Sequence, residues 1–178
     1  MKGEYFEKYG DEGHELIYFQ GNHNLPAFAK ALITTYGNLD HRARELLLEY
    51  NSGNQMTDKK ELYWKMTLNY YTKKEIDGDE QWPGFPFHVD IASNGDITFI
   101  LSLGAPAIME FKAKENTTTP DNVHRVLLEP NSLVAIAGEA RWNWMHRIVP
   151  TGNKFEHEGK AFVRTNERKS VVFGCRFK

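Results

Sequence analysis

The chain has 178 residues and a formal net charge of −2, which suits a single globular domain with its own core. Hydrophobic residues make up 40% and charged residues 26% of it, the balance of an ordinary soluble protein. No window has the roughly 20 continuous apolar residues of a membrane span. The single cysteine, Cys175, excludes an internal disulfide. We therefore expect a monomer without membrane association, cytoplasmic or alternatively nuclear.

The first sixty residues are expected to form a helical front to the domain. Apolar residues recur at helical spacing in 24–36 and again in 40–50, and Gly37 between them is a typical stop signal. Because the segments after residue 60 show the period of strands, we expect these helices to pack on the outside of a β structure.

From residue 60 onward the period of the sequence becomes two. The segment 62–71 places Leu62, Trp64 and Met66 on one face and Thr67 and Asn69 on the other. Further strands are expected at 96–103, 107–113, 124–129, 132–138, 141–149 and 168–177. Short strands separated by turns are typical of a sandwich or barrel. The sequence therefore predicts a mainly β domain with N-terminal helices.

His88 and Asp90 follow the breaker-rich run 82–86 and lie two residues apart. Side chains at this spacing project to the same side of an extended segment, so they could form half of a metal site. A third ligand must come from elsewhere, and His146 is the best candidate because its aromatic-rich surroundings indicate a buried strand. A core histidine bonded to a backbone carbonyl is an equally good explanation of His146.

Together, His88, Asp90 and His146 would form a set of two histidines and one carboxylate. In a facial arrangement this set is typical of non-haem Fe(II) oxygenases, because it leaves coordination positions open for other ligands. Zinc accepts the same ligand types, so the set alone does not identify the metal.

The last predicted strand places Arg168 and Ser170 on one face. A buried guanidinium needs an anionic partner, and a bound dicarboxylate would provide one through paired hydrogen bonds. The alternative is an edge strand that exposes Arg168 to solvent.

Five segments resemble, in order, the signature of AlkB-like Fe(II)/2-oxoglutarate dioxygenases. They are His88-x-Asp90, 102–111, 127–133, 138–150 and 168–173, and the resemblance covers roughly residues 60–178. It implies a double-stranded β-helix, also called a jelly roll, with a cupin-like fold. It also implies Fe(II) bound by His88, Asp90 and His146.

The same resemblance implies a set of residues that bind 2-oxoglutarate as cosubstrate. Arg168 would bind its distal carboxylate, and the implied set is Asn69, Tyr71, Arg168 and Ser170. One position departs from the family, because members that repair nucleic acids usually have a second arginine six residues after the first. That position is Gly174 here, and Arg176 is a candidate replacement.

The resemblance divides the single domain 1–178 into two regions. Residues 61–178 would be the jelly-roll catalytic core. Residues 1–60 match nothing that we can place, and they occupy the position where the family builds its substrate lid.

The implied function is that of a dioxygenase that hydroxylates or oxidatively demethylates its substrate. It would consume 2-oxoglutarate and O₂ and release succinate and CO₂, with formaldehyde when an N-methyl group is attacked. Family habit and the basic segment 141–178 favour N-methylated DNA or RNA, with Trp64, Trp82 or Phe87 as stacking surfaces. A pI near 6.4 and Gly174 favour a protein side chain or a small molecule. A non-enzymatic jelly-roll binding module is the third alternative.

Overall fold

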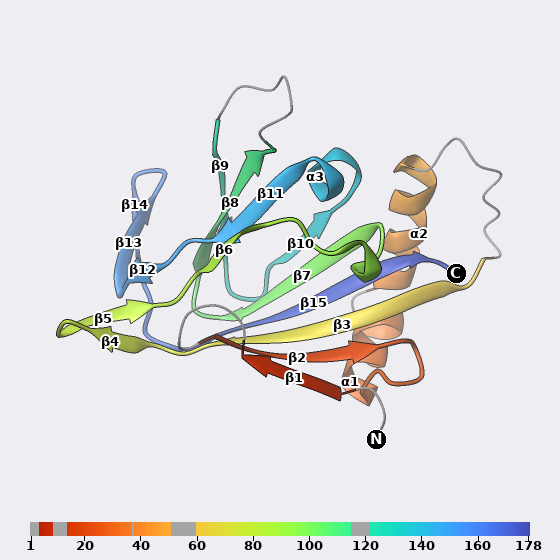
Figure 1. Cartoon of the computed structure of the whole chain (residues 1–178), viewed down its shortest axis with the longest axis horizontal. Helices are drawn as coiled ribbons and strands as arrows, with labels where there is room; N and C mark the ends of the chain where they lie inside the picture. The colour runs from red at the N-terminus through yellow and green to blue at the C-terminus, as the bar shows by residue number, and fades with distance from the viewer. Residues whose placement is uncertain (1–3, 9–13, 37, 51–59, 115–121) are drawn as a thin grey trace.

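The computed structural model describes residues 4–8, 14–36, 38–50, 60–114 and 122–178, and it consists mainly of two antiparallel sheets (Figure 1). The larger sheet contains, in spatial order, β1 (Glu4–Lys8), β2 (His14–Gln20), β3 (Leu62–Tyr71), β15 (Arg168–Phe177), β7 (Ile97–Gly104) and β10 (Leu133–Ile136). The smaller sheet contains β6 (Phe85–His88), β11 (Trp144–Ile148), β8 (Ala107–Ala113) and β9 (His124–Leu128). This is the predicted mainly β, jelly-roll class of fold.

Two small β elements extend the end of the molecule near the start of β15. One is a sheet of β12 (Thr151–Gly152), β5 (Asp79–Trp82) and β4 (Lys74–Ile76), and the other is the hairpin of β13 (Lys154–His157) and β14 (Lys160–Val163). The sequence pattern does not predict these strands, because they are too short to show a clear period.

The N-terminal helices cover one face of the larger sheet (Figure 1). They are α1 (Ala27–Ala31), the π-helical turn η1 (Leu32–Tyr36) and α2 (Leu39–Tyr50). Their apolar residues share a core with the apolar face of β3, and its buried members include Ala29, Ala43, Leu47, Leu62, Trp64 and Met66. The opposite, more polar face of β3 therefore points toward the smaller sheet. No helix in the described ranges is long and apolar enough to cross a bilayer.

Two segments differ from the expected secondary structure. Residues 1–60 contribute β1 and β2 as well as helices, and β2 pairs with β3 along its whole length. The expected strand 141–149 is instead the helix α3 (Gly138–Trp142) followed by β11. Tertiary contacts explain the second difference, because the buried Arg141 side chain binds the backbone near Asp90 from the end of α3.

The pairing of β15 between β3 and β7 positions the residues predicted to bind a cosubstrate. Arg168 lies opposite Tyr71, and Ser170 lies opposite Asn69. On its other edge β15 pairs with β7, so that Ser170 also lies opposite Ser102. The four predicted residues therefore lie on two adjacent strands and point to one side of the sheet.

The smaller sheet is joined across three strands by Glu110, which is only 1% exposed. Its carboxylate accepts hydrogen bonds from Arg125 Nε at 2.8 Å and Arg147 Nε at 2.6 Å. Burial would raise the pKa of Glu110, but the hydrogen bonds from the two arginines outweigh it and lower the pKa.

We expect Glu110→Gln to lower the free energy of unfolding by about 1 to 3 kcal/mol, because an amide leaves one guanidinium without its acceptor. Because the pKa of Glu110 is lowered by folding, the carboxylate stabilises the protein above the unfolded pKa of about 4.3. The difference between the variant and the wild type should therefore shrink on acidification below that pH. Denaturant unfolding across this range measures it, with the exposed Glu156→Gln as the control.

Candidate metal centre

The structure brings together the three predicted metal ligands from two strands and the loop after one of them. His146 on β11 is the direct cross-strand partner of His88 on β6, and their ring centres lie 4.3 Å apart. Asp90 Oδ1 lies 3.5 Å from His88 Nε2 and 3.8 Å from His146 Nε2. One ligand atom of each residue lies within 4.8 Å of the other two, close enough for a single ion to contact all three.

Neighbouring groups fix the orientation of these side chains. His88 Nδ1 lies 2.9 Å from the carbonyl oxygen of Pro86, so this nitrogen donates and Nε2 keeps its lone pair for a metal. Thr98 Oγ1 donates to Asp90 Oδ2 at 2.9 Å. Arg141 donates to the backbone carbonyls of Asp90 and Ile91, both at 2.9 Å, and so fixes the loop that carries the carboxylate.

The electrostatic environment gives Asp90 and His146 the protonation states that metal binding requires. Burial opposes ionisation of Asp90, but the nearby rings of His88 and His146 and the hydrogen bond from Thr98 outweigh it and lower the pKa of Asp90 to about 2. Burial, followed by the charge of His88, lowers the pKa of His146 to about 4. At neutral pH Asp90 is thus a carboxylate and His146 is neutral. The two imidazole nitrogens and one carboxylate oxygen of the three residues fit a divalent metal such as Fe(II).

The three residues line a cavity of about 610 Å³ between the two sheets. All four predicted cosubstrate residues, Asn69, Tyr71, Arg168 and Ser170, line the same cavity. Its apolar wall includes Ile100, Met109 and Ile148. The structure therefore brings the predicted metal ligands and the predicted cosubstrate residues to one cavity, where their roles stay predictions.

Arg168 is fully buried in this cavity, so the alternative of an exposed edge strand is wrong. None of its three guanidinium nitrogens has a hydrogen-bond partner in the part of the chain that the structure describes. The Tyr71 ring centre lies 4.8 Å from Arg168 Cζ. Burial lowers the pKa of Arg168, and the nearby Tyr71 offsets this only in part, so the protein interior disfavours the charge. An anion bound beside Arg168 would remove that penalty.

No family model matches. The tRNA (carboxymethyluridine(34)-5-O)-methyltransferase alkbh8 of Xenopus tropicalis is 36% identical over 87 residues, which is 48% of this chain and 12% of that protein. The corresponding Mus musculus protein is 34% identical over 87 residues, 48% of this chain and 11% of that protein. The chain thus matches about an eighth of the length of these relatives.

Two solved structures share the fold of nearly the whole chain. OsALKBH1 has a TM-score of 0.52 and 14% identity, and the match covers 97% of this chain and 84% of that one. A Pseudomonas putida prolyl-4-hydroxylase has a TM-score of 0.52 and 9% identity, covering 97% of this chain and 78% of that one. The resemblance to AlkB-like 2-oxoglutarate oxygenases is confirmed.

His14 is a supporting residue of this cavity that sequence reasoning missed. Its Nε2 lies 3.0 Å from Asn69 Oδ1, and its ring stacks on Tyr71 with the centres 4.4 Å apart. His14 therefore orients two of the predicted cosubstrate residues from the neighbouring strand β2. Nothing in the polar N-terminal sequence indicates this role, because the contact depends on the pairing of β2 with β3.

The structure does not place Arg176, the candidate replacement of the family's second arginine, in the cavity. Gly174 faces the turn η2 (Ala92–Asn94), and a Cβ at Gly174 would lie only 1.9 Å from the carbonyl oxygen of Asn94. A larger side chain therefore does not fit at this position. Arg176 is exposed, lies over the Tyr63 ring and is not among the residues that line the cavity.

The candidate stacking surfaces are also not in this cavity. Trp64 and Trp82 are buried, and Phe87 contacts the guanidinium of Arg147. Phe85 takes their place beside the metal ligands, because its ring meets the His88 ring edge-on with the centres 4.5 Å apart.

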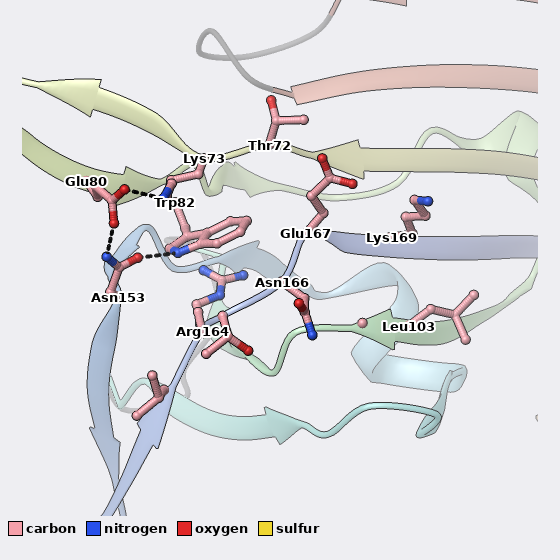
Figure 2. A pocket seen from close by; sticks show the side chains of 13 residues that line it. Thr72, Lys73, Glu80, Trp82, Leu103, Asn153, Arg164, Asn166, Glu167 and Lys169 are labelled. Atoms are coloured by element: carbon pink, nitrogen blue, oxygen red, sulfur yellow. Dashed lines mark hydrogen bonds and ion pairs between the residues drawn. The ribbon is translucent and has the colours of Figure 1, made fainter.

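A second cavity, of about 940 Å³, is lined by Arg164, Trp82, Asn153 and Glu80 (Figure 2). Arg164 is only 2% exposed, donates to Thr151 Oγ1 and lies 5.2 Å from the Trp82 ring centre. Burial, followed by the charge of Arg168, lowers the pKa of Arg164 to about 10. The charges of Arg164 and Arg168 thus interact near this end of the larger sheet.

We expect Thr98→Val to weaken binding of a divalent metal about tenfold, because the variant removes the hydroxyl that orients the Asp90 carboxylate. Calorimetric titration with Co(II), which resists oxidation, measures the Kd. Thr67→Val is a matched control, because Thr67 lines the same cavity and has no hydrogen bond to Asp90. An equal effect of both substitutions would contradict this role of Thr98.

Proposed function

We propose that this AlkB-like protein is an Fe(II)- and 2-oxoglutarate-dependent dioxygenase that hydroxylates or oxidatively demethylates its substrate. The observation that carries the proposal is a buried, unpartnered Arg168 in the same cavity as the His88, Asp90 and His146 cluster. A metal site alone would fit many functions. A metal site that shares its cavity with an unpaired guanidinium fits a metal-dependent reaction with an anionic cosubstrate.

In this proposal each group has a defined role. His88, Asp90 and His146 hold the iron, while Arg168 and Ser170 bind the distal carboxylate of 2-oxoglutarate. Bound there, Fe(II) and 2-oxoglutarate supply the oxidation: O₂ is consumed, 2-oxoglutarate becomes succinate and CO₂, and a substrate C–H bond becomes C–OH. When the carbon is an N-methyl group, the product releases formaldehyde.

The chain itself contributes the positioning of these groups. Thr98 and Arg141 hold Asp90 and its loop, and His14 holds Asn69 through a hydrogen bond and Tyr71 through ring stacking. These contacts fix the ligands before the reactants bind, which is how a protein lowers the entropic cost of assembling several components.

N-methylated nucleic acid is the substrate that we propose. The relatives from Xenopus tropicalis and Mus musculus are named for action on tRNA, although this chain matches only about an eighth of each. A cavity of about 610 Å³ also has room for more than a small diacid, since pockets for drug-sized ligands run from about 300 to 1,000 Å³. A protein side chain or a small molecule is the second candidate, favoured by Gly174 in place of the second arginine.

The ligand assignment is tested with Fe(II) and 2-oxoglutarate together. Under anaerobic conditions the wild type should develop the weak visible charge-transfer band of the iron chelate, and in air it should form succinate. His88→Ala and Asp90→Ala should lose both signals, because two remaining ligands hold Fe(II) poorly. The exposed His41→Ala is the control. Succinate formation at the wild-type rate in either ligand variant would remove that residue from the site.

The cosubstrate assignment is tested with Arg168→Met. We expect the KM for 2-oxoglutarate to rise by roughly tenfold to a hundredfold, because a hydrogen-bonded charge pair is worth about 1.5 to 3 kcal/mol. Lys169→Met removes the same charge from the next, exposed position of β15 and should leave KM within about twofold. Similar increases in both variants would indicate a general charge effect and contradict a specific contact with Arg168.

A further inference from the structure

Lys65 on β3 is a second buried cation of the cavity that the proposed iron and 2-oxoglutarate do not use. Its residue exposure is 3%, and it lines the same cavity as the metal ligands. Within the ranges that the structure describes, it has no carboxylate partner; its ammonium contacts the Tyr18 ring, whose centre lies 5.7 Å from Nζ. An ammonium that lines a cavity without a carboxylate beside it can pair with an anion that enters the cavity.

The register of the larger sheet places Lys65 at the level of the metal centre. Lys65 lies opposite Gly174, which in turn lies opposite Thr98, the residue that binds Asp90. The contact with Tyr18 directs the ammonium toward β2, away from β15 and β7. It therefore faces the part of the cavity that β2 borders through Leu16, Tyr18 and Gln20.

Lys65 is poorly placed to share the anion of Arg168. Arg168 lies opposite Tyr71, which is six residues from Lys65 on β3. The Cα atoms of Lys65 and Tyr71 are thus about 20 Å apart at about 3.3 Å per residue. A five-carbon diacid is less than about 9 Å long, given bonds of about 1.5 Å. The Lys65 ammonium is also directed toward the Tyr18 ring on β2, whereas the Arg168 guanidinium lies over the Tyr71 ring, and these directions favour different ligands for the two cations.

We infer that Lys65 binds a backbone phosphate of a single-stranded nucleic acid substrate, next to the position where its C–H bond is oxidised. The inference rests on the proposed function and deepens it by assigning the anion that the substrate brings. Lysine binds phosphate as a compact charge, and an aromatic ring beside it, here Tyr18, offers a surface for stacking a base. The side-chain amides of Gln20 and Asn94 line the same cavity, and each can donate a hydrogen bond to such a substrate or accept one from it.

Binding of a short fluorescein-labelled oligothymidylate, followed by anisotropy across a salt series, tests this contact. Lys65→Met should raise the Kd about tenfold and lower the slope of log Kd against log salt by about one. Lys65→Arg should restore most of the affinity. Lys30→Met, which removes an exposed lysine from α1 outside the cavity, is the control and should bind like the wild type.

Two further measurements separate a phosphate contact from a role of Lys65 in folding or in binding of 2-oxoglutarate. Thermal unfolding of Lys65→Met should show no loss of stability, because methionine keeps the apolar part of the side chain and no ion pair is lost. The Kd for 2-oxoglutarate should change less than about twofold in the same variant. If the Kd for 2-oxoglutarate rose in Lys65→Met as much as it does in Arg168→Met, Lys65 would be a cosubstrate contact, and this result would overturn the inference.

The remaining outcomes distinguish failure of the inference from failure of the proposed function. Oligothymidylate binding that is equal in Lys65→Met and the wild type would overturn the phosphate contact. A wild type that forms succinate but binds an acidic peptide through Lys65 instead of the oligothymidylate would overturn it too, and leave the oxygenase proposal intact. Lys65-dependent oligothymidylate binding without succinate formation would support the contact and count against the oxygenase.

Discussion

The pairing of β15 with β3 on one edge and β7 on the other is the constraint on which the site depends. One register places Arg168 beside Tyr71 at one end and Gly174 between Lys65 and Thr98 at the other. Because side chains alternate across a strand, a shift of one residue would turn Arg168 and Ser170 toward the helices. The buried Phe173 and Cys175, which pack in the helix-facing core, would then enter the cavity. The hydrophobic core therefore fixes the register, and the register fixes the site.

Folding of the larger sheet buries positively charged side chains of the site, which costs free energy. Arg168, Arg164 and Lys65 are buried cations on or beside its strands, and Arg168 lacks any hydrogen-bond partner among the described residues. Each unpaired charge opposes folding, and the apolar core beneath the helices offsets that cost. Ligand binding then releases part of the penalty, since an anion that pairs with a buried guanidinium stabilises the folded state alone. The cavity is thus less stable empty than filled, as expected of a binding site.

Periodicity predicted most of the large sheet and the faces of the proposed cosubstrate residues. Strict alternation in β3 and β15 identified the faces of Asn69, Tyr71, Arg168 and Ser170, and the structure places all four in the cavity. The spacing of His88 and Asp90 predicted a shared direction, which the loop after β6 preserves. Such predictions succeed because local backbone geometry determines the face of the sheet toward which a side chain points, and the alternation in the sequence reflects that geometry directly.

The residues that support the ligands could not be found in this way, because their roles depend on contacts between distant segments. Arg141 reads as part of a strand, yet it lies near the end of a short helix, from which it reaches the backbone at Asp90 and Ile91. His14 acquires its role from the pairing of β2 with β3. No local pattern encodes either contact, because each joins segments that lie far apart in the sequence.

Lys65 shows the limit of pattern analysis most clearly, because its face was evident and its environment was not. A lysine on the polar face of a strand is normally solvated, and here the smaller sheet and β2 enclose that face. The carbonyl of Asn94 packs against Gly174 and excludes any side chain there, so an arginine cannot bring charge to this level of the sheet from β15. Lys65, the cross-strand partner of Gly174, brings it from β3. Lys65 therefore provides a positive charge on the side of the cavity that β2 borders, where we propose that the substrate binds.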